Sequence, residues 1–281
     1  MFRQDLLAGK RLAITGGGSG LGRAMAQRFL ELGAEVVICG RREEVLAETA
    51  EALGAETGGP ITWHVCDIRD PQSVEDFVAW LWQGGAPDGL VNNAAGNILA
   101  RSQDLSHRAF DAVVNIVLKG TAYMTLACGK RWIAEQRPAN VLSIVTSYAW
   151  TGSGYVLPSA MAKAGVLAMT QSLAAEWGPH GIRLNAIAPG PFPTPGAWDR
   201  LLPMDKLRDE ITKRIPLGRV GEHRELADLA TYLLADGSGY VTGDVVTIDG
   251  GEWLKGAGQF TWVGDLMDEE DWAAIKPKKK G

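Results

Sequence analysis

TGGGSGLG, residues 15–22, joins an apolar stretch typical of a β-strand (11–15) to a stretch with helical periodicity (21–32). Glycines allow a backbone to turn sharply and to approach a pyrophosphate closely. The first turn of the following helix offers free N–H groups and the positive end of the helix dipole. A strand, a turn and a helix with this glycine spacing therefore predict a dinucleotide-binding loop. A tight turn without a ligand is the alternative.

The same alternation of strands and helices continues along the chain. Strands that alternate with helices predict parallel pairing through right-handed crossovers, and continuously apolar strands indicate a sheet covered on both faces. We expect an α/β fold with a single doubly wound parallel sheet of the Rossmann type. The predicted strands are 11–15, 35–39, 61–66, 89–92, 140–146, 182–187 and 245–248, and the predicted helices are 21–32, 43–53, 72–82, 106–136 and 159–177.

The chain shows no internal repeat and no linker between two cores, so we expect one dinucleotide-binding and catalytic domain over 1–281, with its core at about 10–251. Six prolines between 189 and 217 predict a substrate loop with short helices, or a purely structural excursion. The tail, 252–281, contains three tryptophans. We expect it either to pack on a neighbouring subunit or to close the site in part.

Composition excludes several classes of protein. The chain has 35 glycines in 281 residues, 22% charged residues and a formal net charge of −5. This balance argues against a disordered chain and against nucleic acid as the main partner. Three cysteines without a C-x-x-C spacing indicate a reducing compartment, and four dispersed histidines predict no metal site. Without an apolar run of membrane-spanning length or a targeting sequence, we expect a cytoplasmic protein with no membrane span.

The choice of dinucleotide depends on the residues after the second strand. An acid there would bind the adenosine ribose diol, but the sequence reads Cys39-Gly40-Arg41-Arg42. Two guanidiniums suit a 2′-phosphate, so we predict NADP(H); two solvated arginines at a helix start are the alternative. Asp67 follows the third strand, where its carboxylate can accept the adenine amino group. Small residues in 92–96 let the chain pass beside the cofactor.

These motifs resemble the short-chain dehydrogenase/reductase family over about residues 10–251, together with a lysine helix around Lys163, Ala188-Pro189-Gly190 and Asp249-Gly250-Gly251. The resemblance implies an NADPH-dependent oxidoreductase that assembles as a homotetramer. The residues predicted to bind the cofactor are Thr15, Gly16, Gly18, Ser19, Gly20, Leu21, Arg41, Arg42, Asp67, Asn93, Ala94, Lys163, Pro189, Gly190 and Phe192.

One residue departs from the family pattern. The family's proton-transferring tyrosine lies four residues before the lysine, and here Ser159 stands in that place. An unassisted serine hydroxyl is a far weaker acid than a phenol, so we do not expect an ordinary carbonyl reductase mechanism. The departure is similar to the mitochondrial-type 2,4-dienoyl-CoA reductase branch, in which the tyrosine precedes the lysine by fifteen residues, as Tyr148 does here. Further similarity lies in 92–97, with Asn97 at its end, and in 151–159, 172–177 and 189–191.

That branch implies a specific chemistry. A hydride from NADPH adds to the δ carbon of a 2,4-dienoyl-CoA thioester, as in fatty acid β-oxidation. Tyr148 and Asn97 then stabilise the dienolate at the thioester oxygen, as an oxyanion hole does. Lys163 holds the nicotinamide ribose and, as a cation, lowers the pKa of Tyr148. Ser159 binds substrate or a water, and water protonates the α carbon to give a 3-enoyl-CoA.

The resemblance also implies contacts with the acyl-CoA. These involve Arg69, Ile98, Ser106 and Arg200, with Ile98 where the branch usually has Phe, and Arg41 can touch both ligands.

Other interpretations stay open for the candidate residues. Arg69, Ser106 and Arg200 could simply be solvated. Tyr148 could only pack, Tyr155 lies eight residues before the lysine, Asn97 could cap a turn, Ser159 could be a helix N-cap, and Lys163 could lie on the surface. For the whole protein, one rival function is another short-chain reductase, acting on a trans-2-enoyl-CoA, a carbonyl or a sugar. The other is a non-catalytic NADP(H)-binding sensor.

Overall fold

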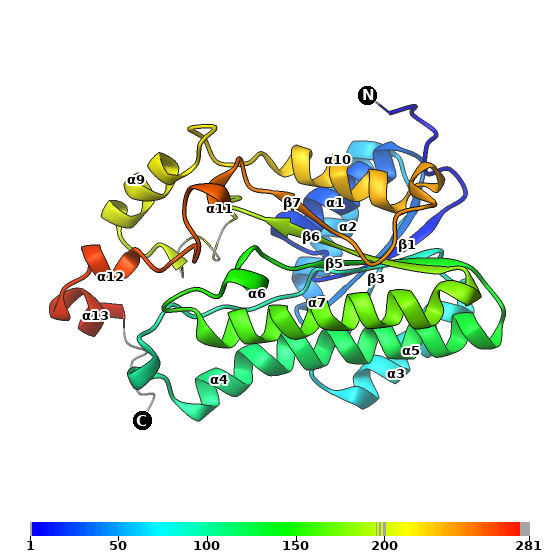
Figure 1. Ribbon diagram of the computed structural model, residues 1–281. Helices are drawn as coiled ribbons and strands as arrows, with labels where there is room; N and C mark the ends of the chain where they lie inside the picture. The colour runs from blue at the N-terminus through cyan, green and yellow to red at the C-terminus, as the bar shows by residue number, and fades with distance from the viewer. Residues whose placement is uncertain (1, 195, 197, 199–200, 276–281) are drawn as a thin grey trace.

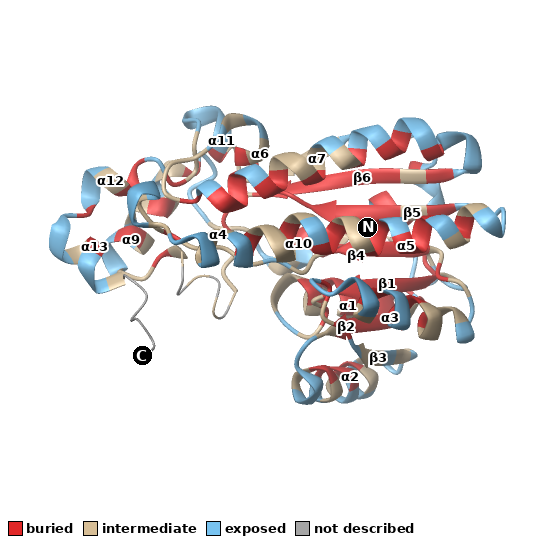
Figure 2. Cartoon of the chain, turned by 90° about the horizontal axis from the view of Figure 1, so that it is seen from below, coloured by how far each residue is buried: buried red, intermediate tan, exposed pale blue. Residues whose placement is uncertain are grey.

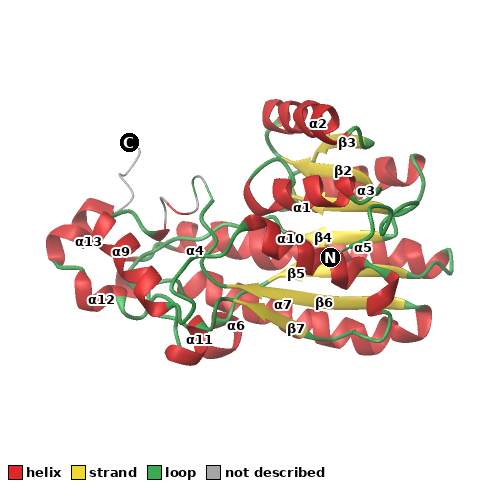
Figure 3. Cartoon of the chain, turned by 90° about the horizontal axis from the view of Figure 1, so that it is seen from above, coloured by secondary structure: helices red, strands yellow, loops and turns green. Residues whose placement is uncertain are grey.

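The computed structural model describes residues 2–194, 196, 198 and 201–275. Within them, seven parallel strands form one sheet in the order β3-β2-β1-β4-β5-β6-β7 (Figure 3). The doubly wound parallel sheet expected from the sequence is confirmed. The strands are β1 Arg11–Thr15, β2 Glu35–Gly40, β3 Ile61–Val65, β4 Gly89–Asn92, β5 Ala139–Ile144, β6 Ile182–Pro189 and β7 Val245–Ile248.

Helices cover both faces of the sheet (Figure 1). One layer contains α1 Gly20–Glu31, α2 Glu43–Thr57 and α10 His223–Leu234, and the other contains α3 Pro71–Gln83, α4 His107–Val114, α5 Thr121–Ala134 and α7 Leu157–Trp177. Shorter elements are η1 Ser102–Asp104, η2 Asn115–Gly120, α6 Tyr148–Thr151, η3 Gly178–His180, α9 Asp205–Arg214, η4 Asp236–Ser238, α11 Glu252–Lys255, α12 Val263–Leu266 and α13 Glu269–Ile275.

Local chemistry explains where several helices begin and end. The Asp70 side chain accepts a hydrogen bond from the backbone N–H of Gln72, so it caps α3 just before Pro71. Helix α2 runs four residues beyond its predicted end and stops at Gly58, whose φ of +68° is the left-handed conformation that glycine adopts easily.

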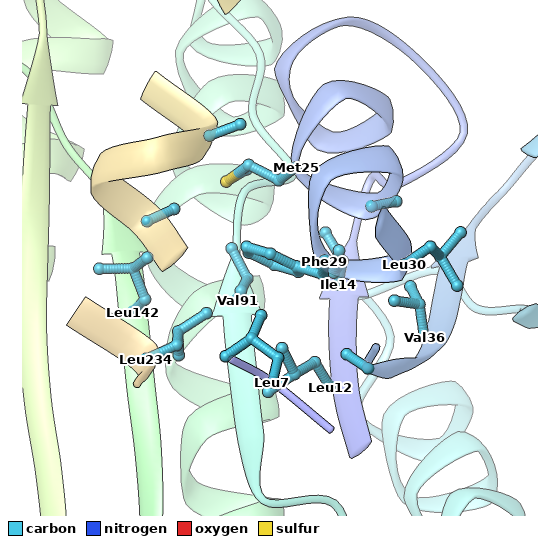
Figure 4. Close-up of a cluster of buried hydrophobic side chains, with 14 of the residues drawn as sticks. Leu7, Leu12, Ile14, Met25, Phe29, Leu30, Val36, Val91, Leu142 and Leu234 are labelled. Atoms are coloured by element: carbon cyan, nitrogen blue, oxygen red, sulfur yellow. The ribbon is translucent and has the colours of Figure 1, made fainter. Parts of the chain in front are cut away.

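The core lies on both sides of the sheet, and the central strands β2, β1, β4, β5 and β6 are buried along most of their length (Figure 2). On one face, side chains of β1, β4 and β5 pack against α1 and α10 (Figure 4). Phe29 of α1 is fully buried there, between Ile14 of β1 and Val91 of β4. Burial of a side chain of this size stabilises the folded state by roughly 1.5–3 kcal/mol. Phe29 therefore fixes α1, whose first turn follows the glycine loop.

The opposite face is covered by a long helical stretch, 107–134, that joins α4, the π-helical η2 and α5. By length and composition it is the one helix in the described ranges that could cross a membrane, and half of its most apolar window is buried. Cys128 and Trp132 are fully buried against the sheet. Such a core helix passes the same test, so this stretch is weak support for a span, and the absence of a span stays a prediction.

Residues 252–275, which we call the C-terminal segment, lie beside α9 at one end of the sheet (Figure 3). Its buried side chains join those of residues from three other parts of the chain in a separate apolar cluster. That cluster contains Leu99, Tyr148, Val156, Ala160, Leu202, Leu207, Ile211, Phe260, Trp262, Val263, Met267 and Trp272. Of the two placements expected for the tail, closing the site is the one that these described contacts favour.

The C-terminal segment begins with a buried carboxyl group. Glu252 is 5% exposed, and its Oε2 accepts a hydrogen bond of 2.9 Å from Gln259 Nε2. Its Oε1 has no hydrogen-bond partner among the described residues. Burial raises the pKa of Glu252 to about 7, against the lowering effect of the Gln259 amide.

This burial predicts a pH-dependent stability. Because the folded-state pKa of about 7 exceeds the usual 4.5, the folded protein holds a proton that the unfolded chain releases between these values. The free energy of unfolding therefore falls as pH rises through this range. The side chain of Glu252→Gln cannot titrate. Between pH 5 and pH 8 we therefore expect the free energy of unfolding of this variant to fall by about 2 kcal/mol less than that of the wild type. Urea unfolding of both proteins measures this difference, and parallel pH profiles would contradict it.

Candidate active site

A cavity of about 670 Å³ opens at the carboxyl ends of the strands. It extends from the glycine loop, past the residues that follow β4 and β5, to α9 and the C-terminal segment. Of the predicted cofactor residues, it is lined by Gly16, Gly18, Ser19, Gly20, Leu21, Arg41, Arg42, Asp67, Asn93, Ala94, Lys163, Pro189, Gly190 and Phe192. It is also lined by Asn97, Tyr148 and Ser159. The fold thus brings together most of the residues that the sequence singles out.

The glycine loop has the shape that a pyrophosphate needs. Gly16 has a φ of +68°, and a Cβ there would lie 3.0 Å from Ala94 Cα. A Cβ at Gly17 would overlap the side chain of Ile38. Ser19, the N-cap of α1, makes no side-chain capping bond, so the N–H groups of the first turn have no side-chain partner there. A cradle of close backbone with free N–H groups fits a dinucleotide phosphate.

Thr15 and Asn93 hold this loop against the end of β4. Thr15 Oγ1 accepts hydrogen bonds of 3.1 Å from the backbone N–H groups of Asn93 and Ala94. Asn93 Nδ2 donates in return to the carbonyl oxygens of Thr15 and Gly16, at 3.0 and 3.2 Å. Thr15 is 1% exposed and does not line the cavity. Its part in the site is therefore to position the loop.

Three predicted ligand-binding arginines, in different environments, follow β2 and β3. Arg41 and Arg42 are exposed and line the cavity, and neither makes an ion pair with another described residue. Arg69 instead donates to the Asp67 carboxylate, with its Nε 2.9 Å from Oδ1. This bond lowers the pKa of Asp67. Arg69 therefore pairs with Asp67 and lies outside the cavity lining. The lowered pKa keeps Asp67 ionised, and its carboxylate already accepts hydrogen bonds from Arg69.

At the centre of the site, two polar side chains contact the phenol oxygen of a buried tyrosine. Tyr148 begins α6, just after β5, and is 4% exposed. Asn97 Nδ2 donates to Tyr148 Oη at 3.1 Å, and Ser159 Oγ lies 3.0 Å from the same oxygen. The backbone N–H of Ile98 donates to Asn97 Oδ1 at 2.8 Å. This bond orients the Asn97 amide so that its NH₂ group faces the phenol.

Burial dominates the acidity of Tyr148. It raises the pKa of the phenol, while the hydroxyls of Ser159 and Thr146 and the Asn97 amide lower it. Tyr148 therefore keeps its proton at neutral pH. The Lys163 ammonium donates to the Ile144 carbonyl, and the expectation that Lys163 lowers the pKa of Tyr148 stays a prediction. Lys163 is 6% exposed, and burial lowers its own pKa to about 8.

The structure also decides between the alternatives that the sequence left open for Ser159 and Tyr155. Helix α7 begins at Leu157 with Val156 as its N-cap, so Ser159 is not a capping residue. Tyr155 stacks on Trp272, with ring centroids 5.0 Å apart, and does not line the cavity. Tyr148 is therefore the tyrosine at the site.

Two further predicted substrate contacts, Ser106 and Ile98, lie outside the cavity lining. The Ser106 side chain accepts a bond of 3.2 Å from the backbone N–H of Ala109 and caps α4. Ile98 packs against Val113 and other apolar residues, and neither Ser106 nor Ile98 lines the cavity. Arg200 lies outside the described residues.

The residues that line one end of the cavity were not predicted individually from the sequence. Its apolar wall consists of Trp198, Leu201, Leu202, Ile211 and Phe260, with Gln259 beside them. Thr146 also lines the cavity near Tyr148. The apolar wall joins the substrate loop to residues about fifty positions later in the chain. Its sequence signals are the predicted substrate loop, 189–217, which contains four of these wall residues, and the aromatic content of the tail.

Known proteins resemble this chain over most of its length. A family model described as enoyl-(acyl carrier protein) reductase matches residues 16–252. The chain is 39% identical over 288 residues to a probable (3E)-enoyl-CoA-producing 2,4-dienoyl-CoA reductase of Caenorhabditis elegans, covering 100% of this chain and 93% of the relative. It is 40% identical over 248 residues to a probable (2E)-enoyl-CoA-producing 2,4-dienoyl-CoA reductase of Bacillus subtilis, covering 88% and 97%.

Solved structures give the same family. A short chain dehydrogenase from Bacillus anthracis matches with a TM-score of 0.78 and 41% identity, over 86% of this chain and 96% of that chain. A putative 2-deoxy-d-gluconate 3-dehydrogenase from Agrobacterium tumefaciens with bound NADP matches with a TM-score of 0.82 and 32% identity, over 90% and 100%. The chain therefore belongs to the short-chain dehydrogenase/reductase family, whose members are oxidoreductases that use NAD or NADP.

Proposed function

We propose that this enzyme uses NADPH to reduce 2,4-dienoyl-CoA thioesters. The observation that carries the proposal is the meeting of Tyr148, Asn97 and Ser159 at one buried oxygen inside the cavity. The position that holds the proton-donating tyrosine in the wider family is occupied by Ser159, and the phenol comes from the start of α6. Two relatives with 39% and 40% identity are named as 2,4-dienoyl-CoA reductases, which supports the same reaction class.

The hydrogen bonds explain how Tyr148 can stabilise negative charge. When Asn97 Nδ2 and the Ser159 hydroxyl both donate to Tyr148 Oη, the phenol oxygen has no acceptor position left. Its own O–H is then free to donate into the cavity. Asn97 keeps a second amide N–H for the same purpose. The two donors form an oxyanion hole for the thioester oxygen, and Ser159 acts by positioning the phenol.

When bound, NADPH would supply a hydride for the δ carbon of the dienoyl group. Negative charge then spreads through the dienolate to the thioester oxygen, where Tyr148 and Asn97 donate. Because burial raises the pKa of Tyr148, the phenol donates a hydrogen bond without losing its proton. Water protonates the α carbon and gives a 3-enoyl-CoA. The two named relatives differ in product, (3E) in one and (2E) in the other, so the product double bond is part of the test.

The cofactor end supports NADP(H) over NAD(H). Arg41 and Arg42 both line the cavity where the adenosine ribose would lie, without an ion-pair partner among the described residues. Two such guanidiniums suit the 2′-phosphate dianion. Lys163, buried beside the same cavity, holds the nicotinamide ribose hydroxyls.

Substrate preference tests the reaction directly. We expect NADPH oxidation with 2,4-hexadienoyl-CoA to be at least about tenfold faster, in kcat/KM, than with crotonyl-CoA or a panel of ketones and sugars, because an oxyanion hole acts where charge develops. NMR of the product locates its double bond. Activity on ketones alone would contradict the proposal. Tight NADPH binding without turnover of any acyl-CoA would identify a sensor instead.

Removal of one oxyanion donor tests the role of Tyr148. For Tyr148→Phe we expect a loss of about 10²-fold or more in kcat with hexadienoyl-CoA, with an unchanged Kd for NADPH. Tyr155→Phe is the matched control, because its ring stacks on Trp272 outside the cavity lining; it should leave kcat unchanged. An unaltered rate in Tyr148→Phe would refute the role of the phenol.

The cofactor proposal predicts a selective loss of affinity. Hydrogen bonds to charged groups contribute roughly 1.5–3 kcal/mol each, so the double variant Arg41→Ala/Arg42→Ala should bind NADPH about 10²-fold more weakly or worse. Its Kd for NADH should change little. Arg23→Ala controls for the loss of positive charge, since Arg23 pairs with Glu56 on α2, at 3.3 Å, outside the cavity lining. Fluorescence titration measures each Kd, and an equal loss for both cofactors would contradict recognition of the 2′-phosphate.

A further inference from the structure

The far end of the cavity has a chemistry unlike the rest. Beyond Tyr148 its wall is formed by aliphatic and aromatic side chains, among them Leu202, Ile211 and Phe260. All three are at most 4% exposed. The phosphates of CoA and of a dinucleotide need charged or polar partners, whereas a hydrocarbon chain needs an apolar wall of this kind. This end therefore suits the acyl tail of a thioester whose oxygen lies at Tyr148.

Phe260 is the part of that wall contributed by the C-terminal segment. Its ring lies 6.4 Å from the ring of Tyr148, centroid to centroid, with the two planes inclined by 59°. A thioester whose oxygen lay at Tyr148 would therefore bring its acyl chain close to this ring. Substitution of Phe260 changes the size of the apolar end of the cavity.

The backbone around Phe260 is fixed to the loop that follows Tyr148. The N–H of Phe260 donates to Ser153 Oγ at 2.9 Å, and the N–H of Gly154 donates to Thr261 Oγ1 at 3.2 Å. The two bonds run in opposite directions between the same two segments. They hold Phe260 in one position relative to α6, so it is a fixed wall of the pocket.

The rest of the C-terminal segment is fastened to the elements around the cavity. The Arg214 guanidinium of α9 lies 4.7 Å from the ring centroid of Trp262. Farther along, Glu269 pairs with Arg101 at 2.5 Å, and Asp271 pairs with Lys206 of α9. Exposed ion pairs contribute little individually. The burial of its apolar side chains in the cluster described above provides most of the attachment, and the aromatic contact, the two hydrogen bonds and the ion pairs add to it.

We propose that Phe260, held by the C-terminal segment, sets the longest acyl chain that the active site accepts. The inference rests on the proposed dienoyl-CoA substrate, because it takes the thioester to lie at Tyr148 and the acyl tail beyond it. It assigns residues 252–275 to the substrate site. It also predicts that substitutions of Phe260 in opposite directions shift the preferred chain length in opposite directions.

The test compares kcat/KM for 2,4-hexadienoyl-, 2,4-decadienoyl- and 2,4-tetradecadienoyl-CoA in three proteins. A single methylene in an apolar pocket changes kcat/KM by about tenfold or more. Phe260→Ala should therefore raise the ratio of the longest to the shortest substrate by at least about tenfold. Phe260→Trp should lower that ratio. A purely structural role would lower all three values together and leave the ratio unchanged.

Two controls keep the result interpretable. Trp253→Ala removes another aromatic of the same segment, which stacks edge-on against Trp150 at 6.0 Å and does not line the cavity. It should keep the wild-type ratio. Where Phe260→Ala does not fold, as judged by thermal unfolding, Phe260→Leu takes its place.

A second measurement separates this inference from the proposed function. Isothermal titration of the NADP⁺-loaded protein with saturated hexanoyl-, decanoyl- and tetradecanoyl-CoA reports chain length without turnover. Phe260→Ala should bind the longest of these at least about tenfold more tightly relative to the shortest than the wild type does. If no dienoyl-CoA is reduced, the proposed reaction is wrong while this binding ratio still tests the wall. If the ratios do not change in either assay, Phe260 does not set chain length.

Discussion

The side chain of Asn93 ties the ends of two neighbouring strands, β1 and β4, at the place where the strand order of the sheet reverses. At such a point the chains leave the sheet in opposite directions and a crevice opens. Thr15 completes the tie from the other side. Every later part of the site is placed relative to this crevice, because the glycine loop forms one of its walls and the segment leading to Asn97 forms the other.

The strands could be predicted from the sequence because most are short apolar runs, and the central five are buried along most of their length, a pattern that short-range residue order displays. Their ends were less predictable. Strand β6 continues to Pro189, two residues past its predicted end, because a proline at a strand end sacrifices no pairing N–H. Helix α2 outlasts its prediction because Gly58, and not the preceding residues, supplies the left-handed turn that stops it.

Some features of the site could likewise be predicted from the sequence, and others could not. The pairing of Tyr148 with Asn97 follows from where two adjacent strands end, which the order of elements determines. The acidity of Tyr148 could not be predicted, since burial and three separate neighbours determine it. Likewise, the sequence could not show that the Lys163 ammonium donates to the Ile144 carbonyl. Spacing along a helix determines which face a residue occupies, while its partner depends on the packed surroundings.

The attachment of the C-terminal segment has a further consequence for how the protein is made. The cavity-lining residues of the glycine loop and of the segments that follow β2, β3 and β4 precede residue 98, and the last strand of the sheet ends at Ile248. The apolar end of the cavity needs Phe260 as well. During synthesis the walls around the glycine loop therefore leave the ribosome long before the segment that completes the apolar end.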